Sequence, residues 1–353
     1  MNLFLILLTF GAIEWTETSF EDFRDGSVDP MCYVSHRAQY ETVEGCVEFY
    51  ARWDADNDGY YDLFVAGKEE FGQRLFMGSQ TGYHSDDYIE FNDWTQDAGG
   101  ADMADLNLDG YPELIHSGGW YAPSIYIYWG TESGPDPSNL TTLNTPNSSQ
   151  CHETVFTYDI DKDGYLDLTT CGGGNGPNYT RIFWGAPGNP IQYETSNRTD
   201  LPSGIGCQHN LEMADLDHDG WVDMVIPNYG TSNASIVHFQ EEGDYTIETL
   251  DLSPLSRGLH GTTLADFDGD EWLDIVFTGW NSVDEALIYW GGPDGYHQDS
   301  TTLLYPGTCY GGSSSMDINN DGLLDLVFHR NGSSSTYPLV YYNTGVSPYF
   351  WES

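Results

Sequence analysis

Basic residues are scarce in this sequence. Its 353 residues include 10 Lys and Arg against 56 Asp and Glu, and the lysines are Lys68 and Lys162 alone. The formal net charge of −46 argues against nucleic acid and anionic membrane surfaces as partners, because both repel a polyanion. The same charge favours a protein that binds cations, that functions in high salt, or both.

Long hydrophobic runs and helical periodicity are also missing. The longest apolar run, within "MNLFLILLTFGAIEW", is too short to span a bilayer but long enough for a secretory signal. We predict a signal peptide over residues 1–13, with a buried first strand as the alternative, and no transmembrane segment. The six cysteines suit an oxidising compartment. Secretion or display at the cell surface is therefore expected.

One acidic phrase returns six times. It reads "DADNDGYYD" at Asp54, and its later copies begin at Asp105, Asp159, Asp215, Asp266 and Asp317, 51 to 56 residues apart. A short apolar segment follows each copy, and an aromatic segment such as "IYWG" comes about 22 residues after each first acid. The 40 glycines and 16 prolines punctuate every segment. Units of this length with about four short strands are typical of β-propeller blades.

The phrase D-x-D-x-D-G-x-x-D between two strands resembles the FG-GAP/VCBS repeat family, which includes the integrin α-subunit propeller. The resemblance runs from about Cys46 to the C-terminus, and it implies an all-β, calcium-binding propeller without implying one activity. Six loops predict six blades in a single domain over residues 14–353, with seven blades as the alternative. By the spacing of the other repeats, the outer strand of the last blade would begin near Trp351, and the sequence ends at Ser353. We therefore expect Met31–Val43 to supply that strand and close the ring.

Alternating oxygen donors are what Ca²⁺ requires, with six to eight ligands. We number each loop from its first acid and predict side-chain ligands at positions 1, 3, 5 and 9, a carbonyl ligand at position 7, and up to six structural Ca²⁺ ions. An EF-hand is excluded, because the twelfth residue is never glutamate and the flanks are not helical. The predicted ligands are Asp54, Asp56, Asp58, Tyr60, Asp62; Asp105, Asn107, Asp109, Tyr111, Glu113; Asp159, Asp161, Asp163, Tyr165, Asp167; Asp215, Asp217, Asp219, Trp221, Asp223; Asp266, Asp268, Asp270, Trp272, Asp274; and Asp317, Asn319, Asp321, Leu323 and Asp325.

The fifth loop departs from the pattern. Gly269 stands between Asp268 and Asp270, and Glu271 occupies position 6, where the other five loops have glycine. Because glycine permits the positive φ that bends the backbone around an ion, the fifth loop is the weakest candidate for calcium.

A second set of residues differs from repeat to repeat. In a propeller these residues would begin the innermost strands, or follow the second strands, on the face opposite the acidic loops. We predict that they bind a ligand there: His152, Glu153, Gln208, His209, Asn210, His260, Tyr310, Trp120 and Trp280. For the six cysteines, which allow 15 connectivities, Cys151–Cys171 and Cys46–Cys309 are the favoured pairs.

No nucleophile elbow, P-loop, dinucleotide fingerprint or HExxH motif occurs. We therefore expect a monomeric, calcium-binding module for adhesion or for binding a glycan or protein ligand, rather than an enzyme. The alternative is an extracellular carbohydrate-active lyase or hydrolase with its site at the mouth of the central channel.

Overall fold

The structure of the protein is a computed structural model. It describes residues 54–66, 73–91, 100–118, 124–144, 154–172, 178–188, 193–207, 210–253, 255, 259–279, 284–307, 309, 312–328, 338–346 and 349–352, together with the backbone of four strands between residues 5 and 51. Within this part of the chain no helix is long and apolar enough to cross a membrane.

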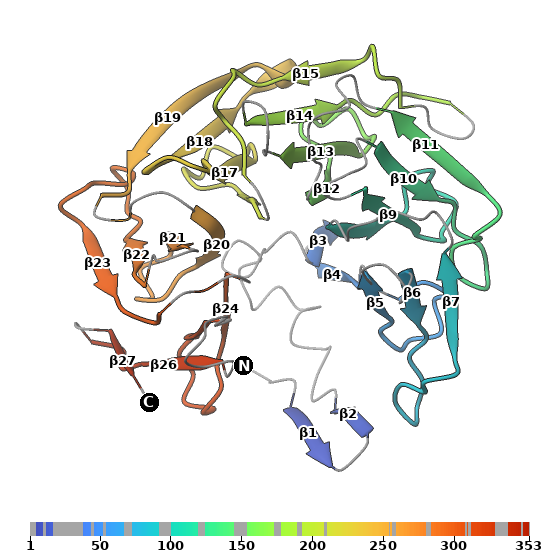
Figure 1. Ribbon diagram of the computed structural model, residues 1–353, viewed down its shortest axis with the longest axis horizontal. Coiled ribbons are helices and arrows are strands. Elements are labelled where there is room, and N and C mark those ends of the chain that lie inside the picture. Colours follow the sequence, from blue (N-terminus) through green and yellow to red (C-terminus); the bar gives the residue numbers. More distant parts are fainter. Residues whose placement is uncertain are drawn as a thin grey trace. The chain divides into compact units, whose positions relative to one another are not determined.

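The repeats fold as antiparallel sheets in which strands consecutive in the chain are hydrogen-bonded neighbours (Figure 1). Five sheets have four strands and one has three. In each four-stranded sheet the first strand leads into an acidic loop, the second leaves it, the third contains the aromatic segment and the fourth is the outer strand. The strands predicted from the repeat are therefore confirmed, and the described chain is all-β except for the short 3-10 helix η3 (Glu241–Gly243).

The described chain divides into two compact units. The first unit contains Asn2–Val28 and Arg37–Leu201. Its sheets are β1 (Leu5–Thr9) with β2 (Ala12–Thr16); β3 (Ala38–Val43) with β4 (Cys46–Ala51); β5 (Leu63–Ala66), β6 (Gln73–Phe76) and β7 (Tyr88–Phe91); β8 (Ala101–Ala104), β9 (Glu113–Ser117), β10 (Ser124–Tyr128) and β11 (Leu140–Asn144); and β12 (Thr154–Tyr158), β13 (Asp167–Gly172), β14 (Tyr179–Phe183) and β15 (Arg198–Asp200).

The second unit consists mainly of Pro202–Ser353. Its sheets are β16 (Glu212–Ala214), β17 (Asp223–Pro227), β18 (Asn233–Phe239) and β19 (Tyr245–Asp251); β20 (Leu259–Ala265), β21 (Asp274–Gly279), β22 (Ala286–Tyr289) and β23 (Thr301–Leu304); and β24 (Ser313–Met316), β25 (Asp325–Phe328), β26 (Leu339–Asn343) and β27 (Phe350–Glu352).

Neighbouring sheets within a unit share apolar cores. Ile127 of β10 and Val155 of β12 belong to one buried cluster, and Ile236 of β18 and Phe277 of β21 belong to another. The second strands β9, β13, β17 and β21 are buried along their whole length, whereas the outer strand β11 is mostly exposed. The second strands of these four sheets are therefore covered on both faces, and the sheet that contains β11 meets solvent at its outer edge.

Polar side chains join the first strands of adjacent sheets. Asp102 of β8 is buried, and its Oδ2 accepts hydrogen bonds from the backbone N–H of Thr157 (2.8 Å) and from its hydroxyl (2.7 Å) on β12. In the second unit, Thr263 Oγ1 of β20 donates to the carbonyl of Ser313 on β24 (2.9 Å). These bonds fix the spacing of the strands that lead into the acidic loops.

The predicted placement of Met31–Val43 is wrong. β3 pairs with β4 in a hairpin from Val43↔Cys46 to Ala38↔Ala51, and the last sheet obtains its fourth strand from β27. A hairpin with two connecting residues costs little closure entropy, whereas pairing β3 with β26 would have to close a loop of most of the chain. Buried Phe350 anchors β27 by packing edge-on against Phe267, with ring centroids 5.3 Å apart.

Candidate metal sites in the acidic loops

The six acidic loops share one backbone conformation. Positions 4 and 6 have positive φ, as in the third loop at Lys162 (58°) and Gly164 (91°). A Cβ added to Gly164 would meet nothing within 4 Å, so this glycine is needed for its backbone angles rather than for space. The other pairs are Asn57 and Gly59, Leu108 and Gly110, His218 and Gly220, Gly269 and Glu271, and Asn320 and Gly322.

The fifth loop keeps this conformation with its residues exchanged. Gly269 takes position 4 (φ 78°), and Glu271 takes position 6 with φ 75°. The left-handed region costs a residue with a Cβ about 1–2 kcal/mol. The irregular sequence of the fifth loop therefore leaves the backbone conformation of the loop unchanged, and it places Glu271 in a strained backbone conformation.

Within each loop, carboxylates accept backbone N–H groups. In the first loop Asp54 accepts from Asp58 (3.1 Å) and Gly59 (3.0 Å), while Asp58 accepts from Tyr60 (2.8 Å). The same bonds recur from positions 5 and 6 to position 1 in the second, fourth and sixth loops. An ionised carboxylate has about four lone-pair sites, so these bonds orient the acids and leave oxygen lone pairs for a cation.

The position-9 carboxylate ties its loop to the third strand. Asp167 Oδ2 accepts the N–H of Ile160 (2.8 Å), and its Oδ1 accepts the N–H of Gly185 (2.9 Å), just after β14. Asp62, Glu113, Asp274 and Asp325 make the matching pair of bonds, and all five side chains are buried. These residues hold the fold together whether or not they also bind an ion.

A close backbone contact explains the glycine of the "IYWG" segments. A Cβ on Gly291 would lie 2.4 Å from the carbonyl oxygen of Leu273, and a Cβ on Gly185 would lie 2.6 Å from that of Leu166. Tyrosines donate to these carbonyls, from Tyr296 to Leu273 (2.7 Å) and from Tyr193 to Leu166 (2.6 Å). Our sequence reasoning missed these tyrosines, although the recurring "GYH" around Tyr296 was a visible signal.

The electrostatics of the loops favour a positive partner. Burial raises the pKa of Asp62 to about 7 and the pKa values of Glu113, Asp167 and Asp274 to about 8; backbone hydrogen bonds oppose this and neighbouring acids add to it. Burial also raises the pKa of Asp159 at position 1, and the charges of Asp163 and Asp161 raise it further. A bound cation would therefore favour the ionised form of these carboxylates, because it offsets both the cost of their burial and the repulsion from neighbouring acids.

The donor atoms converge in four of the loops. Carboxylate oxygens of three acids lie within 4.8 Å of one another in each of the sets Asp54, Asp56, Asp58; Asp159, Asp161, Asp167; Asp215, Asp217, Asp219; and Asp266, Asp268, Asp274. Asp159 Oδ1 and Asp268 Oδ1 are buried and accept no hydrogen bond. A buried carboxylate oxygen without a donor is costly, so these residues fit a hard divalent cation. The convergence at Asp266, Asp268 and Asp274 makes the fifth loop as suitable as the others.

The second and sixth loops use asparagine at position 3. Asn107 Oδ1 accepts the N–H of Asp109 (2.9 Å), and its Nδ2 donates to Asp109 Oδ2 (3.1 Å). Asn319 makes the same two bonds with Asp321. An amide thus supplies an internal donor in these loops and lowers their charge by one unit.

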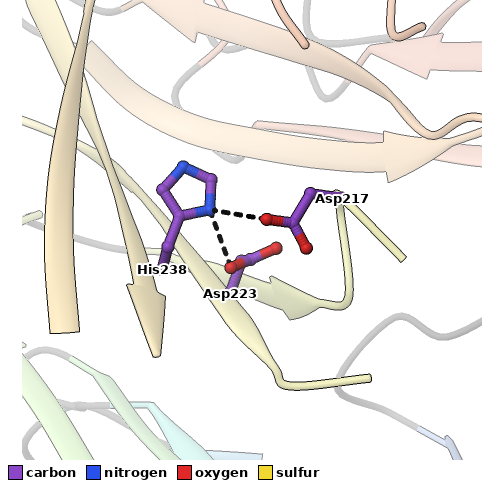
Figure 2. Close-up of side chains that lie close together, drawn as sticks. All are labelled: Asp217, Asp223 and His238. Carbon is purple, nitrogen blue, oxygen red and sulfur yellow. Dashed lines mark hydrogen bonds and ion pairs between the residues drawn. The ribbon is translucent and has the colours of Figure 1, made fainter. Parts of the chain in front are cut away.

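The fourth loop differs through a residue that sequence reasoning missed. Figure 2 shows His238 of β18 beside Asp217 and Asp223. Its Nδ1 lies 2.9 Å from Asp223 Oδ1 and 3.8 Å from Asp217 Oδ2, and its Nε2 lies 3.4 Å from Glu248 Oε2. Hydrogen bonds to Asp223 and Glu248 raise the pKa of His238 to about 10. The signal was the segment "VHF", where most repeats have "IYWG" or a close variant.

Of the nine predicted ligand-binding residues, Asn210 is the one whose side chain is described. His260 is described by its backbone alone, and the other seven lie outside the described residues. Asn210 Nδ2 donates to the carbonyl of Thr262 (3.0 Å) and to Glu212 Oε1 (3.3 Å), so it links adjacent sheets of the second unit. The predicted residues outside are His152, Glu153, Gln208, His209, Tyr310, Trp120, Trp280 and the side chain of His260.

The cysteines confirm the prediction in part. Cys171 and Cys207 are each disulfide-bonded, and Cys151, the partner predicted for Cys171, lies outside the described residues. Cys309 is a buried thiol whose Sγ donates to the carbonyl of Gly307 (3.0 Å). The predicted Cys46–Cys309 pair is therefore wrong, because the Cys309 sulfur is enclosed in its own turn.

Comparison with known proteins gives a family and distant relatives. Mouse cartilage acidic protein 1 is 28% identical over 207 residues, which cover 52% of this chain and 31% of the relative. The human protein is 28% identical over 164 residues, 43% of this chain and 24% of the relative, so the chain spans about a third or less of these relatives. A triple arginine-to-alanine mutant of AofleA from Arthrobotrys oligospora superposes with a TM-score of 0.43 at 11% identity, covering 89% of this chain and 92% of that structure.

The family model described as FG-GAP-like repeat matches residues 159–226, 215–277 and 266–328. Each matched segment begins at the first acid of one loop and extends through the next loop. These are the loops whose shared backbone and hydrogen bonds are described above, so residues 159–328 of the chain are FG-GAP-like repeats.

Proposed function

We propose that the chain is an extracellular, calcium-binding β-propeller of six blades, over residues 14–353, that acts as a ligand-binding or adhesion module. The observation that carries the proposal is the sixfold recurrence of one loop conformation between the first and second strands of successive sheets. Consecutive meanders of about 50 residues favour propeller blades over a sandwich. The disulfides at Cys171 and Cys207 support an oxidising compartment, reached through a signal peptide at residues 1–13.

In each loop, the side chains at positions 1, 3 and 5 and the carbonyl at position 7 would hold Ca²⁺. The position-9 carboxylate would keep its two bonds to the backbone and use its remaining lone pairs toward the ion. A bound Ca²⁺ supplies positive charge that offsets the repulsion within the loop. Its role here is structural, because the same residues fix the turn between the first two strands of each sheet.

The ligand site is proposed for the opposite face, where residues differ from blade to blade. His209 and Trp280 represent this set, which offers hydrogen-bonding groups and flat rings to a glycan or protein surface. The acidic loops are occupied by calcium in this proposal, so the ligand uses the variable residues. A single chain suffices for this arrangement, and we propose a monomer.

Calcium dependence is tested by thermal unfolding of the full chain with chelator and with millimolar Ca²⁺. Sites in extracellular modules bind at about 10⁻⁴–10⁻³ M, so millimolar Ca²⁺ adds about 0.4–1.4 kcal/mol for each occupied loop. Over six loops the melting temperature should rise by about 3–12 °C. An unchanged melt at low salt would contradict the calcium assignment.

Matched variants locate the effect. Asp161→Asn removes a charge inside the third loop and should weaken the response to Ca²⁺. Asp136→Asn is the control, because the carboxylate of Asp136 accepts hydrogen bonds from Ser138 in an exposed turn outside the acidic loops. Equal responses in the two variants would place the calcium effect outside the loops.

Ligand binding is tested on a glycan array with Ca²⁺ present. We expect His209→Ala combined with Trp280→Ala to abolish binding and to leave the calcium-dependent melt unchanged. Loss of binding in Asp161→Asn under saturating Ca²⁺, with normal binding by the double variant, would move the ligand to the acidic-loop face.

A further inference from the structure

The fourth repeat replaces a backbone donor with an imidazole. In the other five repeats, one oxygen of the position-9 carboxylate accepts an N–H at the end of the third strand or just beyond it, as Asp274 does from Gly291 (2.9 Å). In the fourth repeat Asp223 pairs with His238, so Phe239 holds the equivalent position, and among the described residues its N–H makes no hydrogen bond to Asp223. Asp223 Oδ1 therefore faces the ring of His238 in its place (2.9 Å).

The ring is oriented from its far side. Glu248 on β19 pairs with Ile236 and is a diagonal cross-strand neighbour of His238, which pairs with Thr246; its Oε2 lies 3.4 Å from His238 Nε2. A carboxylate on one ring nitrogen sets the tautomer that leaves the other nitrogen as a ligand, and it raises the basicity of that nitrogen. Here the other nitrogen is Nδ1, which faces two carboxylates of the loop (Figure 2).

We propose that His238 Nδ1, Asp217 and Asp223 form a site for a divalent transition-metal ion of the zinc class. The three donor atoms lie within 4.8 Å of one another, a separation that one ion spans. Imidazole nitrogen favours zinc and its neighbours over Ca²⁺, which selects oxygen. Three protein ligands with further positions left to water are a common zinc arrangement.

The site differs in kind from the other acidic loops. Five loops offer only oxygen donors from their own nine residues, whereas this one borrows a nitrogen from the third strand of the same sheet. Its carboxylate Asp223 is also the one position-9 acid whose second oxygen accepts no backbone N–H among the described residues. That oxygen can turn to an ion without breaking a backbone hydrogen bond.

The test is zinc binding to the full chain, measured by titration calorimetry with millimolar Ca²⁺ present to fill the all-oxygen loops. We expect saturable binding of one Zn²⁺ that depends on His238. His238→Asn should lower the affinity at least tenfold while keeping an N–H donor for Asp223. Glu248→Gln, which leaves the ligands intact, should lower it by about 10–100-fold, as loss of a carboxylate behind a ligating histidine does.

His218→Asn is the matched control. His218 belongs to the same loop and stacks on Trp272 at 4.2 Å, and asparagine tolerates its positive φ of 59°, so zinc affinity should not change. Co²⁺ adds a spectroscopic readout, because its visible absorption should change in His238→Asn and not in His218→Asn. Absence of saturable zinc binding, or equal affinity in wild type and His238→Asn, overturns the site. The result is independent of the calcium melt, to which the other five loops still contribute.

Discussion

The glycine after the third strand permits a paired experiment in adjacent residues. Replacing Gly291 with alanine places a Cβ 2.4 Å from the carbonyl oxygen of Leu273, whereas a Cβ on Gly292 meets nothing within 4 Å. The oxygen of Leu273 cannot move aside freely, because it belongs to the backbone and accepts the hydroxyl of buried Tyr296 (2.7 Å). Both variants replace one glycine with alanine, and they differ in whether the new Cβ meets the Leu273 carbonyl.

The magnitude follows from two terms. Relief of the overlap costs about 1–3 kcal/mol, as overpacking does elsewhere. Moving the strand also stretches the bond from the Gly291 N–H to Asp274 Oδ1 (2.9 Å), and a buried carboxylate that loses a donor costs about 1–3 kcal/mol. Gly291→Ala should therefore lower the free energy of unfolding by about 2–6 kcal/mol.

Gly292→Ala should leave stability unchanged or raise it by up to about 1 kcal/mol, because alanine restricts the unfolded chain. The assay is urea denaturation in saturating Ca²⁺, with the free energy of unfolding taken from the midpoint and slope. The reasoning is refuted if Gly291→Ala stays within about 0.5 kcal/mol of the wild type, the range of neutral surface changes, or if both variants lose equal stability.

Two further predictions concern the loops. Glu271→Gly should raise the free energy of unfolding by up to about 1 kcal/mol, because relief of the left-handed strain exceeds the added entropy of the unfolded chain. Glu271→Ala keeps the strain and should not raise the free energy of unfolding. Equal urea midpoints for the two variants would contradict this prediction. In the ion-free protein, burial holds the pKa values of Asp62 (about 7), Glu113, Asp167 and Asp274 (about 8) above their unfolded values. The folded state then binds more protons, so its stability should fall as pH rises from about 4 to about 8. With saturating Ca²⁺ the trend should reverse, and melting curves across this range check both signs.

Local features of this fold are readable from the sequence, and features that join distant residues are not. The strands and acidic loops were predictable because each apolar strand segment lies next to its loop in the sequence. In the third repeat, for example, the loop runs from Asp159 to Asp167, and β13 begins at Asp167. The clamp, by which we mean the two hydrogen bonds that tie a position-9 acid to its own loop and to the end of the third strand, was not predictable, because its second bond reaches a residue 16 to 18 positions later. His238 was missed for the same reason: its partners Asp217 and Asp223 are brought to it by strand pairing. The prediction for Met31–Val43 was wrong because it considered the length of chain available to the last blade and did not consider a local hairpin with the next strand.

Each sheet with its loop and clamp comes from one contiguous stretch of chain, as β8 to β11 do. A duplication of the corresponding stretch of a gene would thus add a complete unit, with its ion ligands and the bonds that hold them already in place. Because the backbone bonds of the position-9 carboxylate hold the sheet together without an ion, a copied unit could change the donors at the other loop positions while its fold persists. The fourth repeat, with His238 in place of a backbone donor, is what such divergence would leave behind.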